Sequence, residues 1–200
     1  MSKRDAKRQA ILDTAYRLFR TQGFDKTSVS QITTEVGGSK ATIYSHFPSK
    51  EDLFVECMAG AAEEYIAEVI AQLDPSGSDP GSVLRDFGVK FLRLICSDDM
   101  VSMRRLMIAE ADRSDIGKLF FTKIISLRAH VADFLTKCMA RGILRSADPQ
   151  LAAEHLRALL EADLAEPILL RVRESAPDEK EITSAADRAV FTFLKAYAPE

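Results

Sequence analysis

Short polar and basic side chains follow a pair of glycines near residue 40. Directly after Gly37 and Gly38 the chain reads Ser39, Lys40, Ala41 and Thr42. Short side chains at the front of a helix let the backbone come close to base edges in a DNA major groove. A lysine there can donate to the acceptors of guanine, and an alanine methyl can contact the methyl group of thymine. The chemistry open to these residues is therefore DNA base recognition.

Two short helices must position these side chains. Apolar residues and capping signals predict one helix from Ser28 to about residue 36 and another from Ser39 to just before Pro48. Ile32 and Ile43 are their expected core anchors. The glycine pair between them predicts a tight turn, and the whole pattern is typical of a helix-turn-helix. A preceding helix over residues 4–22 is expected to end at Gly23, where a left-handed backbone ends helices.

Helical periodicity continues beyond residue 50, and no strand-like alternation occurs. Residues 74–81 are rich in Pro, Gly, Ser and Asp and read as a linker. A proline after Asp148 starts one of the later helices, and Pro167 is expected to kink or break it. The sequence thus predicts an all-α protein of eight or nine helices. The expected later segments are 49–73, 82–97, 99–112, 115–141, 149–173 and 180–197.

The 200 residues carry a formal net charge of −3, but the charge is unevenly distributed. Residues 1–50 hold nine basic and four acidic side chains, whereas the remaining 150 hold 18 basic and 26 acidic ones. Such asymmetry indicates a basic binding module joined to an acidic body.

Composition argues against several other classes. The hydrophobic content of 46% and charged content of 28% are those of a globular protein. No apolar run is long enough for a membrane span, and charges interrupt the start where a signal peptide would be apolar. Three dispersed cysteines favour reduced thiols in a cytoplasm. The three histidines are scattered and lack the spacing of a metal site. The sequence also lacks a nucleophile elbow and a phosphate-binding loop, so we expect no enzyme, cofactor or metal.

The segment from Thr27 to Leu53, together with the preceding helix, closely resembles the DNA-binding domain of the TetR family of bacterial transcription regulators. The resemblance covers about residues 7–57. It rests on Thr27-Ser28-Val29-Ser30-Gln31-Ile32 and on the run from Gly37 through Tyr44-Ser45-His46-Phe47-Pro48 to Leu53. Thr33 and Gly38 depart from the alanine and valine usual in the family. The hydroxyl of Thr33 fits between the helices if it bonds a backbone carbonyl one turn back.

The resemblance implies a helix-turn-helix DNA-binding domain over residues 1–52 and a helical ligand-binding and dimerisation domain over 53–200. It implies a cytoplasmic, homodimeric repressor that binds a palindromic double-stranded operator and is released by a small apolar effector. Tyr44, His46 and Lys50 resemble phosphate contacts of the family. Thr27 and Ser28, at a helix N-terminus, offer phosphate-binding groups. The candidates for base contacts are Ser39, Lys40, Ala41, Thr42 and Ser45.

Two further sets of residues are expected in the C-terminal domain. Broad apolar faces on the last two helices favour a dimer interface of the four-helix type. Its expected members are Leu156, Leu160, Leu164, Ile168, Val190, Phe193 and Leu194. Aromatic and methionine side chains of the middle helices adapt to apolar ligands. The expected pocket residues are Phe87, Phe91, Met103, Met107, Phe121 and Phe134.

Two alternatives stay open at this stage. A thiol-redox regulator without a small-molecule effector would need an exposed, activated cysteine among Cys57, Cys96 and Cys138. A helical scaffold that binds only protein would fail to shift the DNA that flanks its own coding region.

Overall fold

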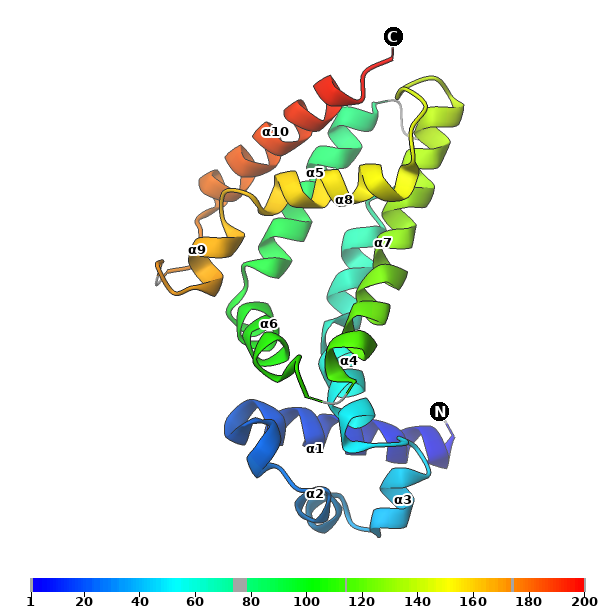
Figure 1. Cartoon of the computed structure of the whole chain (residues 1–200), viewed down its shortest axis with the longest axis vertical. Coiled ribbons are helices and arrows are strands. Elements are labelled where there is room, and N and C mark those ends of the chain that lie inside the picture. Colours follow the sequence, from blue (N-terminus) through cyan, green and yellow to red (C-terminus); the bar gives the residue numbers. More distant parts are fainter. Residues whose placement is uncertain (1, 74–78, 114, 174, 200) are drawn as a thin grey trace. The chain divides into compact units, whose positions relative to one another are not determined.

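The computed structural model describes residues 2–73, 79–113, 115–173 and 175–199, and the regular structure in these ranges is entirely α-helical (Figure 1). The described part contains ten helices, which is slightly more than the eight or nine predicted. They are α1 (Lys3–Lys26), α2 (Val29–Val36), α3 (Lys40–Tyr44), α4 (Lys50–Ile70), α5 (Pro80–Ile95), α6 (Asp98–Glu110), α7 (Ile116–Ala140), α8 (Pro149–Glu161), α9 (Ala165–Leu169) and α10 (Glu179–Ala196).

Local stop and start signals account for most helix ends. Gly23 has a positive φ of 80° and interrupts α1 where the sequence predicted its end, although one more turn follows. The side chains of Asp79 and Asp148 accept hydrogen bonds from the first backbone amides of α5 and α8, which would otherwise lack partners. Residues 74–78 of the predicted linker lie outside the described residues.

The predicted helix over residues 149–173 is two helices. In a continuous helix, Pro167 would clash with the carbonyl of Asp163 and could not donate to it. The chain avoids this conflict because α8 ends at Glu161 and α9 begins at Ala165. Pro167 then lies in the first turn of α9, where an amide donor has no helical partner.

The helices form two compact units. The N-terminal unit consists of Met1–Glu64 and Met103–Lys123, and the C-terminal unit consists of Tyr65–Ser102 and Ile124–Glu200. The predicted boundary between residues 52 and 53 remains a prediction, since contacts group residues 103–123 with the chain up to Glu64, within α4.

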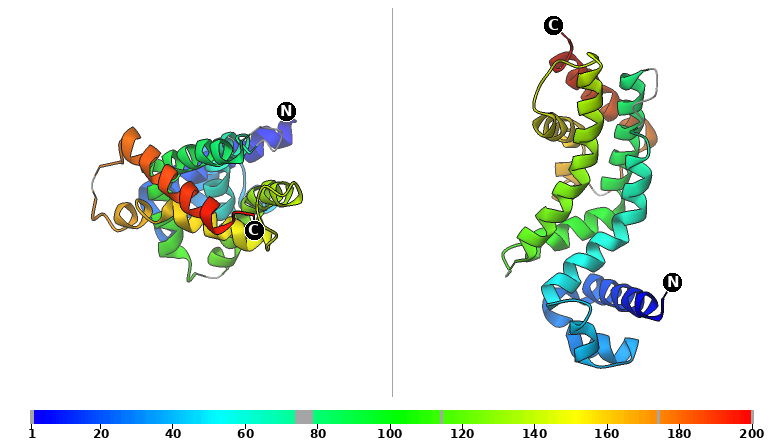
Figure 2. Two further views of the ribbon diagram at one scale, coloured as in Figure 1. Left: turned by 90° about the horizontal axis from the view of Figure 1, so that it is seen from above. Right: turned by 90° about the vertical axis from the view of Figure 1, so that its right-hand side faces the viewer.

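An aromatic cluster forms the centre of the N-terminal unit. The Phe54 ring lies edge-on to Phe19 and Phe24, with centroid distances of 5.0 and 5.1 Å, and all three side chains are buried. Ile32 of α2 and Ile43 of α3 are also buried, as the sequence predicted. Figures 1 and 2 show α1, α2 and α3 gathered around the start of α4. The aromatic cluster therefore anchors the helices that carry the candidate DNA contacts.

In the C-terminal unit, α10 packs against both α5 and α8, and α8 crosses α5 (Figure 1). The core between these helices contains the residues expected at a dimer interface. Leu156, Leu160, Leu164, Ile168, Val190 and Phe193 are buried, and Leu194 packs partly buried against them. Their own chain covers most of these side chains, and the dimer interface expected on α8 and α10 remains a prediction.

The start of α10 makes a pH-dependent contribution to stability. The Arg173 guanidinium donates two hydrogen bonds of 2.7 Å to the Glu181 carboxylate, which also accepts from the backbone amide of Asp178. These bonds to the charged form lower the pKa of Glu181 from 4.5 to about 2. A lowered carboxyl pKa adds stability above pH 4.5, and this stability is lost as the pH falls towards 2.

We therefore expect Glu181→Gln to lower the thermal midpoint of the C-terminal unit at neutral pH and to flatten its decline between pH 4.5 and about 2. Circular dichroism melts across this range measure both effects. Glu166→Gln is the control, because the Glu166 side chain makes no ion pair with a described residue. Equal acid sensitivity of wild type and Glu181→Gln would contradict the assignment.

Candidate nucleic-acid interface

Helices α2 and α3 form the predicted helix-turn-helix, and serine caps fix both starts. The Ser28 hydroxyl accepts a hydrogen bond of 3.1 Å from the Gln31 amide. At α3, the Ser39 hydroxyl accepts from the Thr42 amide, while the Thr42 hydroxyl accepts from the Ser39 amide. This reciprocal capping satisfies two helix-start donors and stabilises a helix of only five residues.

Two departures from the family pattern have clear structural consequences. The hydroxyl of Thr33 donates a hydrogen bond of 2.7 Å to the Ser30 carbonyl, the arrangement that its fit required. In the turn, Gly37 and Gly38 have φ values of 73° and 128°, a region in which residues with side chains are strained. A valine in place of Gly38 would be strained in this backbone, so the conformation of the turn requires glycine at this position.

Most of the predicted base-contacting side chains are exposed on the surface of α3. Ser39, Lys40, Ala41 and Ser45 are exposed, and Tyr44 retains 48% of its accessible surface. Lys40 forms no ion pair with a described residue, so its ammonium is available to a ligand. Thr42 is half-buried, and its hydroxyl belongs to the cap of α3.

Thr27 does not offer its hydroxyl to a phosphate. The side chain is fully buried, and its hydroxyl donates a hydrogen bond of 2.8 Å to the Gly23 carbonyl. Thr27 therefore closes the turn between α1 and α2, which corrects the prediction of a side-chain phosphate contact. The neighbouring Ser28 is exposed.

Lys50 also has an internal role. Its ammonium donates a hydrogen bond of 2.6 Å to the Phe24 carbonyl and lies 4.1 Å from the centroid of the Phe24 ring. Burial lowers the pKa of this lysine, partly offset by the nearby carboxylate of Asp25. The amine thus ties the start of α4 to the end of α1, and its phosphate contact remains a prediction.

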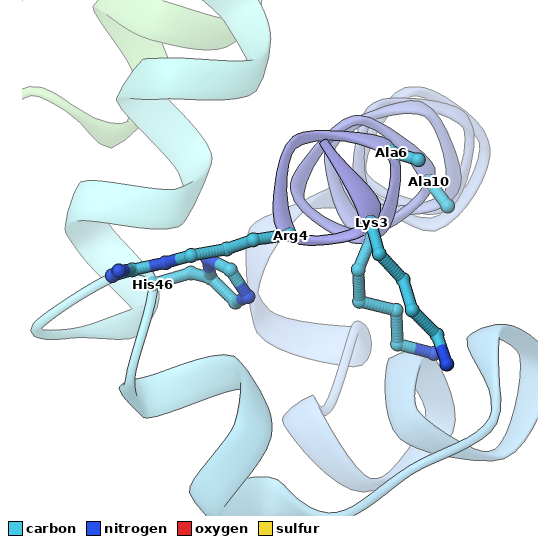
Figure 3. A pocket seen from close by; sticks show the side chains of 6 residues that line it. Lys3, Arg4, Ala6, Ala10 and His46 are labelled. Atoms are coloured by element: carbon cyan, nitrogen blue, oxygen red, sulfur yellow. The ribbon is translucent and has the colours of Figure 1, made fainter. Parts of the chain in front are cut away.

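His46 lines a shallow groove of about 660 Å³ between the end of the helix-turn-helix and the first turns of α1. Figure 3 shows the Arg4 side chain extended beside the His46 ring, with Lys3 on the same helix. Neither Lys3 nor Arg4 forms an ion pair with a described residue. These two cations are among the nine basic residues of the first 50, but no motif in the sequence assigns them a role. The feature of the sequence that could have indicated their role is the density of basic residues before the first apolar position of α1.

The six predicted pocket residues divide between the two units. Phe87, Phe91 and Phe134 belong to the C-terminal unit, where the rings of Phe87 and Phe91 stack with centroids 5.9 Å apart. Met103, Met107 and Phe121 belong to the N-terminal unit. Both methionines are buried, whereas Phe121 is 53% exposed. The shared pocket therefore remains a prediction.

The cysteines and acidic residues show no sign of redox or metal chemistry in the described part of the chain. Cys57, Cys96 and Cys138 are buried, and burial raises the pKa of Cys57 and Cys138, which disfavours the reactive thiolate. Among described residues, no group of three His, Cys, Asp or Glu side chains is arranged to hold a metal ion. None of the described helices is long and apolar enough to cross a membrane.

Family comparisons cover both units. Residues 11–57 match the model described as bacterial regulatory proteins of the tetR family, and residues 82–199 match the C-terminal domain of AefR-like transcriptional repressors. The chain belongs to the TetR family. This confirms the resemblance and the combination of a helix-turn-helix with a helical C-terminal domain.

Individual TetR-family relatives agree with this assignment. The regulator LmrA of Bacillus subtilis is 38% identical over 81 residues, which are 40% of this chain and 43% of LmrA. The chain spans less than half the length of the first curated relatives it matches. A TetR-family regulator from Mesorhizobium loti has a solved structure with a TM-score of 0.85 and 27% identity, covering 99% of this chain and all of that one. The flavonoid-responsive regulator FrrA has a TM-score of 0.80 and 28% identity, covering 98% and 99%.

Proposed function

We propose that this TetR-family chain is a cytoplasmic transcriptional repressor that binds a palindromic operator as a homodimer and is released by a small effector. The observation that carries the proposal is the capped α3, which leaves Lys40, Ala41 and Tyr44 exposed, while His46 just beyond it shares a groove with Lys3 and Arg4. Exposed donors on a short helix that can enter a major groove suit base recognition.

The DNA contacts divide by chemistry. Ser39, Lys40, Ala41 and Ser45 would meet base edges, because they occupy the exposed front and side of α3. Tyr44 and His46, with the hydroxyl and amide groups at Ser28, would meet phosphates. Lys3 and Arg4 would extend the phosphate contacts along the groove that His46 lines. Phosphate contacts would supply affinity on any sequence, and base contacts would supply the preference for one.

Dimerisation would use apolar residues that a single chain leaves exposed. Leu151 of α8 is 52% exposed and Phe191 of α10 is 64% exposed, and these two helices pack against each other. Large exposed apolar side chains on neighbouring helices are typical of an interaction surface. A dimer supplies two half-sites about 34–36 Å apart and hence a palindromic operator.

The effector would be small and largely apolar. The stacked rings of Phe87 and Phe91 provide an aromatic surface at the C-terminal core, and the similar protein FrrA is described as flavonoid-responsive. Ligand binding would release DNA by the difference in its affinity for the DNA-bound and free conformations. The redox alternative has no comparable support, because the three thiols are buried.

Selection from a random duplex library tests the proposal, followed by Lys40→Ala. We expect the wild type to select a palindrome and Lys40→Ala to relax its preference at one base pair in each half-site. A bidentate contact to guanine contributes about 1–3 kcal/mol of discrimination, so roughly tenfold or more of that preference should be lost. Competition gel shifts against single-base variants of the selected duplex measure this loss.

The control is Tyr44→Phe, which removes only a phosphate-facing hydroxyl. Its affinity should fall to a similar extent on every duplex. The base-contact assignment fails if Lys40→Ala keeps the wild-type preference at every position. The proposed function fails if the wild-type protein selects no sequence.

A further inference from the structure

The ammonium of Lys7, in α1, contacts the end of α2 thirty residues away. It donates a hydrogen bond of 3.0 Å to the Val36 carbonyl and a second to the carbonyl of Gly37. The last carbonyls of a helix have no partner within the helix, and a cation there also complements the helix dipole. Lys7 therefore satisfies two successive acceptors where α2 passes into the turn.

The turn that Lys7 holds consists of residues with little conformational restriction. Gly37 and Gly38 both have positive φ values and lack side chains that could fix the backbone by packing. The Lys7 ammonium lies over the second of them, because a Cβ built on Gly38 would be 3.8 Å from the amine nitrogen. Its hydrogen bonds thus restrain the two-glycine turn from outside.

We propose that Lys7 is a positioning residue for sequence-specific DNA binding, an inference that rests on the proposed function. By tying the end of α2 and the two-glycine turn to α1, its ammonium sets the orientation in which α3 is presented to base edges. Small errors in this orientation affect base contacts more than phosphate contacts, because paired base hydrogen bonds have stricter geometry than charge attraction.

Geometry separates Lys7 from the neighbouring cations of the groove. Lys7 is half-buried and donates to two backbone carbonyls, whereas Lys3 is exposed and forms no ion pair with a described residue. The two lysines lie one turn apart on α1 and carry the same charge. Lys3 therefore provides a matched control for a change at Lys7.

The test compares Lys7→Met with Lys3→Met on two labelled duplexes, one selected from a random library by the wild type and the other its shuffled sequence. For Lys7→Met we expect affinity for the selected duplex to fall roughly ten- to a hundredfold and affinity for the shuffled duplex to change much less. The dependence of affinity on salt should stay as in the wild type. Lys3→Met should weaken both duplexes alike and reduce the salt slope by about one phosphate contact for each chain bound.

Rescue by conservative variants distinguishes positioning from general damage. Lys7→Arg, which keeps the donors, should recover much of the preference for the selected duplex. Circular dichroism checks folding, and Lys7→Gln, which keeps an uncharged donor, replaces Lys7→Met if the latter is unfolded. Its preference for the selected over the shuffled duplex is expected to be smaller than that of the arginine variant but still measurable.

The inference is overturned if Lys7→Met weakens both duplexes equally with a reduced salt slope, which would make Lys7 a phosphate contact. It is also overturned if Lys7→Met, or Lys7→Gln where the methionine variant is unfolded, keeps the full preference for the selected duplex. A wild type that selects no duplex would instead overturn the proposed function.

Discussion

Replacing Phe191 with aspartate is expected to leave the chain monomeric and to abolish stable operator binding. The Phe191 ring is 64% exposed on α10, so the substitution leaves the core of the C-terminal unit in place. In a symmetric dimer the change occurs twice, so each copy would bury an unpaired carboxylate at the interface. The aromatic anchor that it replaces would contribute roughly 2 kcal/mol or more to the free energy of dimerisation. We expect the dimer dissociation constant to rise by at least about a hundredfold.

Sedimentation equilibrium over a range of concentrations measures that constant, and a gel shift on the selected duplex reports operator binding. Ile108→Asp is a matched control, because Ile108 is also a large apolar residue with 64% exposure but lies on α6. This control should leave the dimer mass measured by sedimentation unchanged. Unaltered dimerisation of Phe191→Asp would place the interface elsewhere.

Truncating Phe54 to alanine is expected to unfold the N-terminal unit over much of the temperature range in which the wild type is stable. The ring is completely buried between Phe19 and Phe24. Phenylalanine-to-alanine changes in a core cost about 3–5 kcal/mol, because they remove apolar contacts and leave a cavity. This is a large part of the 5–15 kcal/mol, approximately, that stabilises a typical domain.

Urea unfolding followed by circular dichroism measures the loss in the free energy of unfolding. Phe121→Ala is the comparison, since Phe121 is 53% exposed and its truncation should cost under about 1 kcal/mol. A loss at Phe54 no larger than that at Phe121 would show that the aromatic cluster does not anchor the unit. Operator binding should weaken with the folded fraction of the Phe54 variant.

Local features of the sequence were sufficient to predict most of the helices. Glycines with positive φ, serine and aspartate caps, and apolar positions such as Ile32 and Ile43 act within a few residues, so the sequence displays them directly. Pro167 predicted an interruption, but the break lies at 162–164 because the clash of a proline reaches one turn back.

Contacts between distant residues, in contrast, are not displayed by the sequence. An apolar stripe indicates that a helix face is covered but not what covers it, and Leu156 and Phe193 are covered by their own chain. Lys50 and Lys7 resemble solvated surface cations in the sequence, yet both bond backbone carbonyls more than 25 residues away. Thr27 is similar, since only the folded turn shows that its hydroxyl bonds Gly23.

The shortness of α3 limits how much sequence information one chain can read. Its five residues span about 8 Å, which reaches across only two or three base pairs. If each fully read base pair carries about two bits, a dimer would read roughly ten bits of sequence. A ten-bit pattern occurs on the order of a thousand times among ~10⁶ genomic sites. Contacts to base edges of this helix alone would therefore not specify a unique binding site in a genome. If the proposed function holds, the bendability of the DNA between and beside the half-sites would supply further discrimination, and the operators would share a mechanical profile as well as a palindrome.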